Sequence, residues 1–394
     1  MKTILPLWGA AVLATPFMPL QADAASIGVR IAARPTLPYV LQARMQRRPI
    51  FTVLPARGVQ SALLPNQAAH GATIPFFRSS ITSPLDGKRY KWEMVGTNPM
   101  TNQTTTTVNF VPILARVHFI DGSVLDPTQP ACNDTVAVAD RLFGSPLFNA
   151  VDLISNGIDV GTTQIIDGFQ RANFWKYVAG TNFHVLLAPA AKPVLVDITA
   201  PTGSITQTGA CSGSNHNMGE IDINAWDAIV RKLDKKYAQP NQLPIVATYN
   251  VFQTEYHAVC CVLGYHSAFA RPGGTQTYAV GAYNDPGEFS QPIEDIHAWT
   301  HELGEWTDDP FVQSDNYNFT PAWGNVGQVN GCQDNLEVGD PLTGTPFLVT
   351  YNGFTYHPQE LAFFSWFYRT PPTGTGGLYS FEGTFTSAQG TCTG

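Results

Sequence analysis

The stretch "EDIHAWTHELGEWTDDP", residues 294–310, predicts the helix around which we expect the protein to fold. Ser290 and Pro292 suit a helix start, so we expect the helix to run from about residue 291 to 307. Its acidic side chains alone would be typical of a solvated face. Apolar residues are interspersed among them, however: Ile293, Ile296, Trp299, Leu303 and Trp306. The mixture therefore indicates a helix that is partly buried.

The same helix carries a pattern that is typical of a metal site. Positions four apart lie on one helix face, so His301 and Glu305 could bind one divalent cation together. Their motif, H-E-x-x-E, differs from the zinc motif H-E-x-x-H in its last donor, and a carboxylate is itself a zinc ligand. The extra carboxylate favours Zn²⁺ without excluding Mn²⁺ or Ca²⁺. Glu302 would act as general base on water. His297 is followed by Ala298 rather than by an acid, so we expect it beside the site or on the surface.

A third protein ligand is needed, and "DNLEVGD" at residues 334–340 supplies two acidic candidates. Asp340 is the first choice and Glu337 the second, because the chain between them and the helix is long enough to return to it. Asp309, near the end of the helix, is the local alternative. Each of these residues could equally be a turn residue whose carboxylate accepts hydrogen bonds from nearby amides.

The rest of the chain alternates between strand-like and helix-like patterns. Residues 104–119, "TTTTVNFVPILARVHF", are β-branched and alternating, which predicts a strand. Asn224 is expected to cap the helix that follows it. Further strands are expected at 183–188, 193–198, 244–252, 277–283 and 377–385, and further helices at 162–178, 224–238 and 361–369. This mixture predicts an α+β fold, with helices packed on a twisted sheet.

The N-terminus has the pattern of a secretory signal peptide over residues 1–24, with cleavage near Ala24. We therefore expect a secreted protein. Residues 25–125 are expected to form an arm and a β-rich region that could serve as a pro-segment, and residues 126–394 the main domain. Charged residues make up 13% of the chain and the net charge is −8, which disfavours nucleic-acid and membrane partners. Nothing in the sequence indicates an oligomeric state.

Six cysteines in a secreted chain favour disulfides, and six allow 15 pairings. Cys260 and Cys261 are adjacent and would point in opposite directions if the chain is extended there. We therefore expect each of them to have a partner of its own.

Two segments of the motif region resemble a known family. "THELGEWTDDP" (300–310) followed by "LEVGD" (336–340) resembles S-H-E-L-x-E-x-x-T-D-P…E-I-G-D-x-C. That pattern belongs to secreted proteins related to the plant EXORDIUM / phosphate-induced family and to bacterial zincin-like metallopeptidases. Upstream, "CCVLGYHSAF" (260–269) and "TYAVGAYNDP" (277–286) look like the family's preceding segments. The resemblance covers about residues 180–345.

This resemblance implies a zincin-like fold, with His301 and Glu305 as metal ligands, Glu302 as general base and an acidic cluster at Glu337 and Asp340. His266 matches the histidine of the family's "GYHS" segment, which could line the cleft or be a structural residue beside a disulfide. Leu342 stands where the family has a cysteine, so Cys332 could replace that cysteine in pairing with Cys260 or Cys261.

We therefore expect a secreted zinc-dependent metallohydrolase that acts on peptide bonds. The strand at 277–283, if it is a sheet edge, would hold an extended peptide by main-chain hydrogen bonds. The alternative is a non-catalytic secreted or cell-wall-associated binding protein on the same scaffold, which a closed metal site would favour. Glycoside hydrolysis is disfavoured, because Glu302 and Glu305 share one helix and cannot flank a sugar bond from opposite faces.

Overall fold

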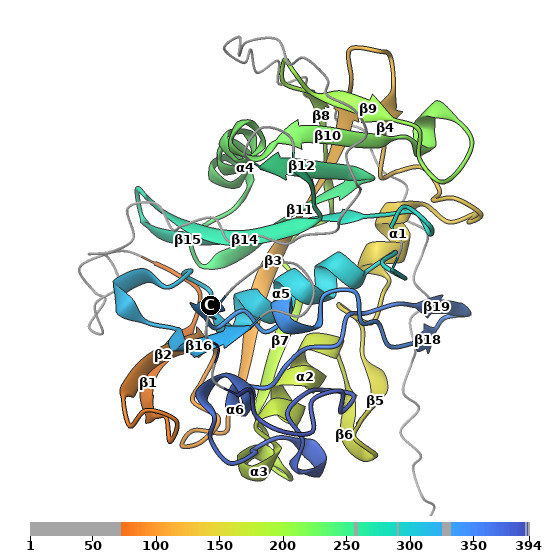
Figure 1. The fold of residues 1–394 in the computed structure, drawn as a ribbon. Coiled ribbons are helices and arrows are strands. Elements are labelled where there is room, and N and C mark those ends of the chain that lie inside the picture. The colour runs from red at the N-terminus through yellow and green to blue at the C-terminus, as the bar shows by residue number, and fades with distance from the viewer. Residues whose placement is uncertain (1–71, 256–258, 290, 325–331, 391, 393–394) are drawn as a thin grey trace, which may run out of the picture.

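The computed structural model describes residues 72–255, 259–289, 291–324, 332–390 and 392 (Figure 1). The signal peptide expected over residues 1–24, and the arm from residue 25 as far as residue 71, lie outside the described residues. Six helices and nineteen strands in the described part confirm the predicted α+β class. Among the described residues, no helix is long and apolar enough to cross a membrane.

A curled seven-stranded sheet organises the protein (Figure 1). Its strands are β3 (Thr105–His118), β4 (Val124–Leu125), β7 (His184–Pro189), β8 (Val194–Thr199), β11 (Gln242–Tyr249), β14 (Gly264–Arg271) and β15 (Gly274–Tyr283). β3 is central: it pairs in parallel with β11 on one side and with β7 and then β8 on the other. β15 lies between β11 and the antiparallel β14, so residues 277–283 do not form a sheet edge, and the condition for their binding a peptide is not met. That position belongs to β14.

A second sheet continues from the first. Its strands are β9 (Ile205–Gln207), β10 (Met218–Asp222), β12 (Val251–Glu255) and β13 (Val259–Val262). The single strand expected at 244–252 is divided between the two sheets as β11 and β12. The division falls at Asn250, whose φ of 51° turns the chain and whose side chain donates to Asp285 at 2.9 Å.

Four two-stranded antiparallel pairs complete the β structure of the described residues: β1 (Phe76–Thr82) with β2 (Arg89–Val95), β5 (Val151–Ser155) with β6 (Ile158–Thr163), β16 (Phe319–Gly324) with β17 (Cys332–Asn335), and β18 (Val349–Tyr351) with β19 (Phe354–Tyr356). The strand expected at 377–385 is absent from the described residues there, which form turns after a short 3₁₀ turn at Thr375–Gly377.

The helices are α1 (Val138–Phe143), α2 (Ile165–Asn173), α3 (Trp175–Val178), α4 (Ile223–Tyr237), α5 (His297–Asp308) and α6 (Phe364–Tyr368). The helix expected at 162–178 starts only after β6 and breaks into α2 and α3. The helix expected at 224–238 is confirmed as α4, but its cap is Asp222 rather than Asn224. The Asp222 carboxylate accepts from the backbone N–H of Asn224 and Ala225, both at 3.0 Å.

Helices cover both faces of the main sheet. Ile245 and Ala247 of β11 pack in the core cluster that contains α2 and α5 residues, whereas Val246 packs with residues of α4. Because successive strand residues point to opposite faces, α4 lies on one side of the sheet and α2 and α5 on the other (Figure 1).

The motif helix α5 begins at His297, later than predicted. Asp295 has a φ of 46°, which an α-helix excludes, and its carboxylate accepts from the backbone N–H and Nδ1 of His357 at 3.0 and 2.7 Å. Ser290 and Pro292 therefore precede the helix. Every residue of α5 is buried, so the prediction of a partly buried helix understated its burial.

Three disulfides are present: Cys132–Cys211, Cys260–Cys261 and Cys332–Cys392. The expectation that the cysteines pair is confirmed. The expectation of separate partners for Cys260 and Cys261 is wrong, as is the pairing of Cys332 with one of them. Cys260 and Cys261 form a disulfide with each other, so their two sulfur atoms lie on the same side of the chain rather than alternating.

Candidate metal centre

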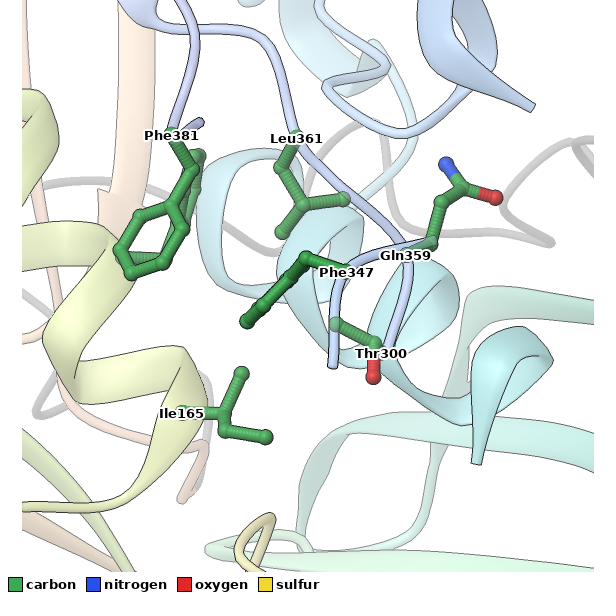
Figure 2. Close-up of a pocket in the computed structure, with 7 residues that line it drawn as sticks. Ile165, Thr300, Phe347, Gln359, Leu361 and Phe381 are labelled. Carbon is green, nitrogen blue, oxygen red and sulfur yellow. The ribbon is translucent and has the colours of Figure 1, made fainter. Parts of the chain in front are cut away.

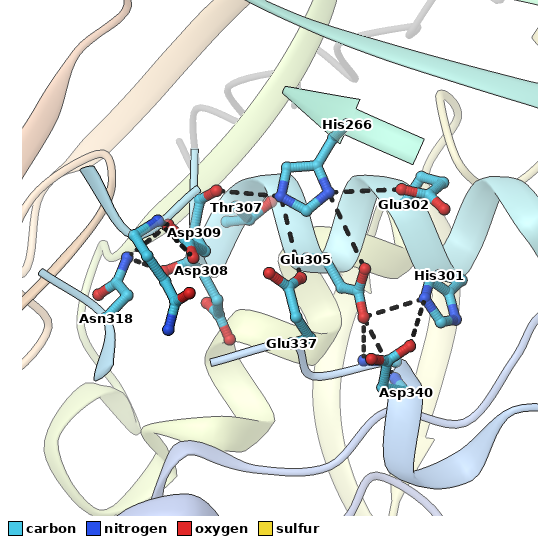
Figure 3. A network of polar contacts seen from close by, with 12 residues as sticks. His266, His301, Glu302, Glu305, Thr307, Asp308, Asp309, Asn318, Glu337 and Asp340 are labelled. Atoms are coloured by element: carbon cyan, nitrogen blue, oxygen red, sulfur yellow. Dashed lines mark hydrogen bonds and ion pairs between the residues drawn. The ribbon is translucent and has the colours of Figure 1, made fainter. Parts of the chain in front are cut away.

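The motif side chains lie together in the interior, between α5 and the strand β14 (Figure 3). His301 Nε2 lies 2.9 Å from Glu305 Oε1, as expected for residues one helical turn apart. His266 faces them from β14, with Nδ1 3.4 Å from Glu302 Oε2 and 3.9 Å from Glu305 Oε2. One helix and one strand thus bring two histidines and two glutamates to one place.

The chain returns to this place directly after β17. The backbone N–H groups of Gly339 and Asp340 both donate to Glu305 Oε1, at 3.1 Å. The Asp340 carboxylate then reaches the first histidine, with Oδ1 3.6 Å from His301 Nε2. Asp340, the first choice for the third ligand, therefore lies on the His301 side of the site.

Glu337, the second choice, lies on the other side. Its Oε2 is 3.9 Å from His266 Nε2, and its side chain is fully buried. Both acidic candidates from "DNLEVGD" therefore reach the cluster, but they face different histidines. Their separation could not be read from the sequence, because the two residues are only three positions apart.

Gly339 allows the close approach of this segment to α5. A Cβ atom at this position would lie 2.5 Å from His301 Nδ1 and 2.6 Å from its Cγ. Gly264 of β14 has a similar role beside Glu302, whose Cγ would lie 2.6 Å from an added Cβ. The absence of side chains at two glycines thus permits the packing of β14 and the return segment on the motif helix.

The hydrogen-bond network assigns the tautomers of both histidines. Gln359 Nε2 donates to the Gly339 carbonyl at 2.6 Å, so Gln359 Oε1 is the acceptor for His301 Nδ1–H at 3.1 Å. His266 Nε2 lies 3.0 Å from the backbone carbonyl of Asp309, so this nitrogen carries the proton. His266 Nδ1 therefore keeps its lone pair, and His301 Nε2 has one whenever His301 is neutral; both nitrogens face carboxylates. Metal-binding histidines are held in this way by outer acceptors.

Burial dominates the electrostatics of the cluster. It raises the pKa of Glu302 and of Glu337 well above the ordinary value, and the nearby charge of Glu305 adds to both shifts. Burial acts in the same direction on Glu305, but the charge and hydrogen bond of His301 outweigh it and lower the pKa of Glu305. Burial lowers the pKa of His266 to about 4. Glu305 is thus the carboxylate most stabilised in its ionised form.

The donor set fits a divalent cation. In two sets of three residues, one ligand atom from each lies within 4.8 Å of the others: His301, Glu302 and Glu305, and His266, Glu305 and Glu337. Tetrahedral zinc ligands lie about 3.3 Å apart, and the contacts above run from 2.9 to 3.9 Å. In the described part of the chain, neither lysine nor arginine forms an ion pair with Glu302, Glu305 or Glu337, although buried carboxylates need a counter-charge.

The two remaining candidates lie outside these sets. The Asp309 carboxylate accepts from Asn318 Nδ2 at 2.9 Å and from the Gln313 backbone N–H, so the local alternative for the third ligand is turned away. Asp309 serves the site through its backbone carbonyl instead. His297 is buried one turn before the motif histidine, and burial lowers its pKa to about 3.

Two positions completed the site without a clear signal in the sequence. The sequence allows His266 to be either a cleft residue or a structural histidine, and the structure places its ring against the motif helix (Figure 3). Gln359, which orients His301, follows the motif by more than 50 residues and has no motif of its own. Only the resemblance through "GYHS" pointed to His266, and no signal pointed to Gln359.

The cluster is enclosed: the exposed fractions are 0% for His301, Glu302 and Glu337, 2% for Glu305 and 4% for Asp340. A small, narrow cavity with no room for a water molecule lies between α2, α5 and the C-terminal segment (Figure 2). It is lined mainly by apolar side chains, together with Thr300 and Gln359. Gln359 therefore connects the wall of this cavity with the ring of His301.

Such an arrangement can bind a divalent cation beside a carboxyl group that accepts or donates a proton. Comparisons of the chain with protein-family models, with curated proteins and with solved structures found no match. The residues themselves thus carry the functional argument.

Proposed function

We propose that this protein is a secreted zinc-dependent hydrolase with a zincin-like fold, and that it cleaves peptide bonds. The observation that carries the proposal is the orientation of His301. Its outer nitrogen, Nδ1, donates to Gln359, so the inner one, Nε2, is the nitrogen left to bind a cation, and it faces Glu305 at 2.9 Å and Asp340 at 3.6 Å. These three side chains, His301, Glu305 and Asp340, could together bind one cation as its protein ligands.

Zinc, when bound there, supplies Lewis-acid chemistry that polarises a carbonyl oxygen. Glu302 is the neighbouring proton acceptor: its Oε1 has no hydrogen-bond partner among the described residues. It would take a proton from an attacking water and pass it to the leaving amine. While Glu302 holds that proton and no cation is bound to His266, it can donate to the lone pair on His266 Nδ1, 3.4 Å away. His266 thereby steadies the protonated form of the general base.

The peptide substrate is proposed from the neighbourhood of β14. In the described part of the main sheet, β14 is the outermost strand beyond β15, and it carries His266. An extended peptide could add to such an edge through main-chain hydrogen bonds. Secretion is proposed from the signal-peptide pattern at residues 1–24, and the three disulfides are compatible with it.

One observation favours a second function. No residue of the cluster is more than 4% exposed, and structural metal sites are closed, whereas catalytic sites keep an open position. A non-catalytic secreted or cell-wall-associated binding protein, with a cation that stabilises the fold, would have this enclosure.

Metal content and peptide cleavage, measured together on the purified mature protein, distinguish these functions. We expect zinc in the wild type, loss of zinc in Glu305→Gln, and retention of zinc with loss of cleavage in Glu302→Gln. Glu294→Gln, which changes a partly exposed acid outside the cluster, is the matched control and should alter neither property. Cleavage is measured on a mixed peptide library by mass spectrometry.

Two other results of these measurements would assign a different function to the protein. A wild type that binds zinc but cleaves nothing in the library is the non-catalytic protein. A wild type that binds no divalent cation, with Glu305→Gln behaving identically, refutes the metal site and with it the proposed hydrolase.

A further inference from the structure

We infer that the centre holds a second divalent cation, bound by His266, Glu305 and Glu337, with Glu305 bridging the two ions. This inference rests on the proposed function, because it adds an ion to the His301 site. The chemistry of the new position, one imidazole nitrogen and two carboxylates, suits Zn²⁺ or Mn²⁺.

Glu305 has the geometry of a bridging ligand. Its Oε1 lies 2.9 Å from His301 Nε2, while its Oε2 lies 3.9 Å from His266 Nδ1. The two oxygens of one carboxylate therefore face two different histidines (Figure 3). Glu305 is also the residue that the two candidate donor sets share. A single cation uses one side of this arrangement and leaves the other side without a counter-ion.

The lone pair of His266 Nδ1 points toward the carboxyl oxygens of Glu302 and Glu305. Its Nε2–H donates to the Asp309 carbonyl at 3.0 Å, so Nδ1 carries a lone pair. That nitrogen faces Glu302 Oε2 at 3.4 Å and Glu305 Oε2 at 3.9 Å. Lone pairs at these distances repel unless a proton or a cation lies between them. The geometry matches the spacing of ligand atoms around one zinc ion, about 3.3 Å.

Glu337 supplies the independent observation. It is fully buried, and in its ionised form neither of its carboxylate oxygens has a hydrogen-bond donor among the described residues; its hydrogen bond with the Glu305 carboxyl requires a proton on one of the two acids. Its neighbours are His266 Nε2, at 3.9 Å, and the Glu305 carboxyl, which is an acceptor when ionised. A carboxyl group in such surroundings is costly to bury in its ionised form, and either a proton or a bound cation removes that cost.

The charges of the cluster agree with two ions. Four carboxylates meet there: Glu302, Glu305, Glu337 and Asp340. If all four are ionised, they carry four negative charges, and one divalent cation leaves two of them. A second divalent cation makes the cluster neutral, with both histidines in their neutral form. Sites of this kind hold their ions about 3.5–4 Å apart.

The test counts cations on the full mature chain. Metal-free wild type is mixed with increasing Zn²⁺ in the presence of a chromophoric chelator, and we expect two equivalents per chain. His266→Ala and Glu337→Gln should each bind one equivalent, whereas Glu305→Gln should bind none tightly. His184→Ala, a histidine of β7 outside both donor sets, is the matched control and should keep two. Circular dichroism checks that each variant is folded.

A second measurement does not depend on any variant. With two equivalents of Co²⁺, the wild type should show the weakened electron paramagnetic resonance signal of two ions coupled through one carboxylate. Two uncoupled Co²⁺ signals would overturn the bridging role of Glu305. One equivalent of Zn²⁺ in the wild type, unchanged in His266→Ala, would overturn the second position and leave the proposed hydrolase standing. No equivalent at all would refute the proposed function itself.

Discussion

Replacing Gly339 by alanine should push the return segment away from His301 and weaken the cation site. The added Cβ would lie 2.5 Å from His301 Nδ1, 2.6 Å from Cγ and 2.7 Å from Cε1. Ordinary contacts between such atoms are about 3.5–4.0 Å, so the segment or the ring must move by about 1 Å. The backbone at Gly339 has φ −83°, which alanine adopts readily, so the contact alone is tested.

Neither partner can move freely. Gln359 accepts from His301 Nδ1 at 3.1 Å and donates to the Gly339 carbonyl at 2.6 Å, which ties the ring to the segment. The Gly339 N–H is held by Glu305 at 3.1 Å. Overpacking of this kind costs about 1–3 kcal/mol. Because disturbing the groups that orient a ligand lowers metal affinity by about 10- to 100-fold, we expect a loss of that size for Zn²⁺.

Zinc affinity is measured by competition with a chromophoric chelator, and stability by urea unfolding of the metal-free protein. Gly390→Ala is the matched control, because a Cβ at that position would meet no atom within 4 Å. It should change neither quantity. If Gly339→Ala bound Zn²⁺ as tightly as the wild type and unfolded at the same urea concentration, the close approach of Gly339 to His301 would be wrong.

Three further predictions follow from other contacts. Gly264→Ala should lower the free energy of unfolding by about 1–3 kcal/mol, because its Cβ would lie 2.6 Å from Glu302 Cγ; an unchanged urea midpoint would contradict this packing. The hydrogen bond of Asp295 raises the pKa of His357 above 6.5. The pair therefore makes its full contribution to the free energy of unfolding below pH 6.5, and this contribution is lost as the pH rises through the raised pKa. The pKa of Asp295 is also raised, and burial is the largest cause of that shift. We therefore take the direction of the pH dependence from His357. His357→Gln should therefore be less stable than the wild type by up to about 1 kcal/mol at pH 5.5, with a smaller difference at pH 9, and a difference that grows with pH would refute the sign. Cys332→Ser opens a disulfide between residues 60 positions apart and should cost about 2–4 kcal/mol under oxidising conditions, with no loss relative to a reduced wild type.

The local part of the site could be predicted because helix geometry is local. The four-residue spacing of His301 and Glu305 places them on one face in any helix, and they lie 2.9 Å apart in the structure. The sequence also predicts that the "DNLEVGD" segment returns to the helix. It does not predict that Asp340 faces His301 while Glu337 faces His266, because the turn after β17 directs their side chains apart. The roles of His266 and Gln359 depend on strands and loops that meet α5 only in the folded chain.

The same division applies to the fold. The sequence by itself determined the α+β class, the central strand and the motif helix, because alternation and helical periodicity reflect which side of an element is buried. The tertiary structure alone decided that β14 rather than β15 is outermost, that Cys260 pairs with its neighbour, and that the acidic helix is wholly buried. The place of β14 in the sheet and the burial of α5 depend on contacts between segments far apart in the chain, and such contacts leave no period in the sequence that could be read in advance.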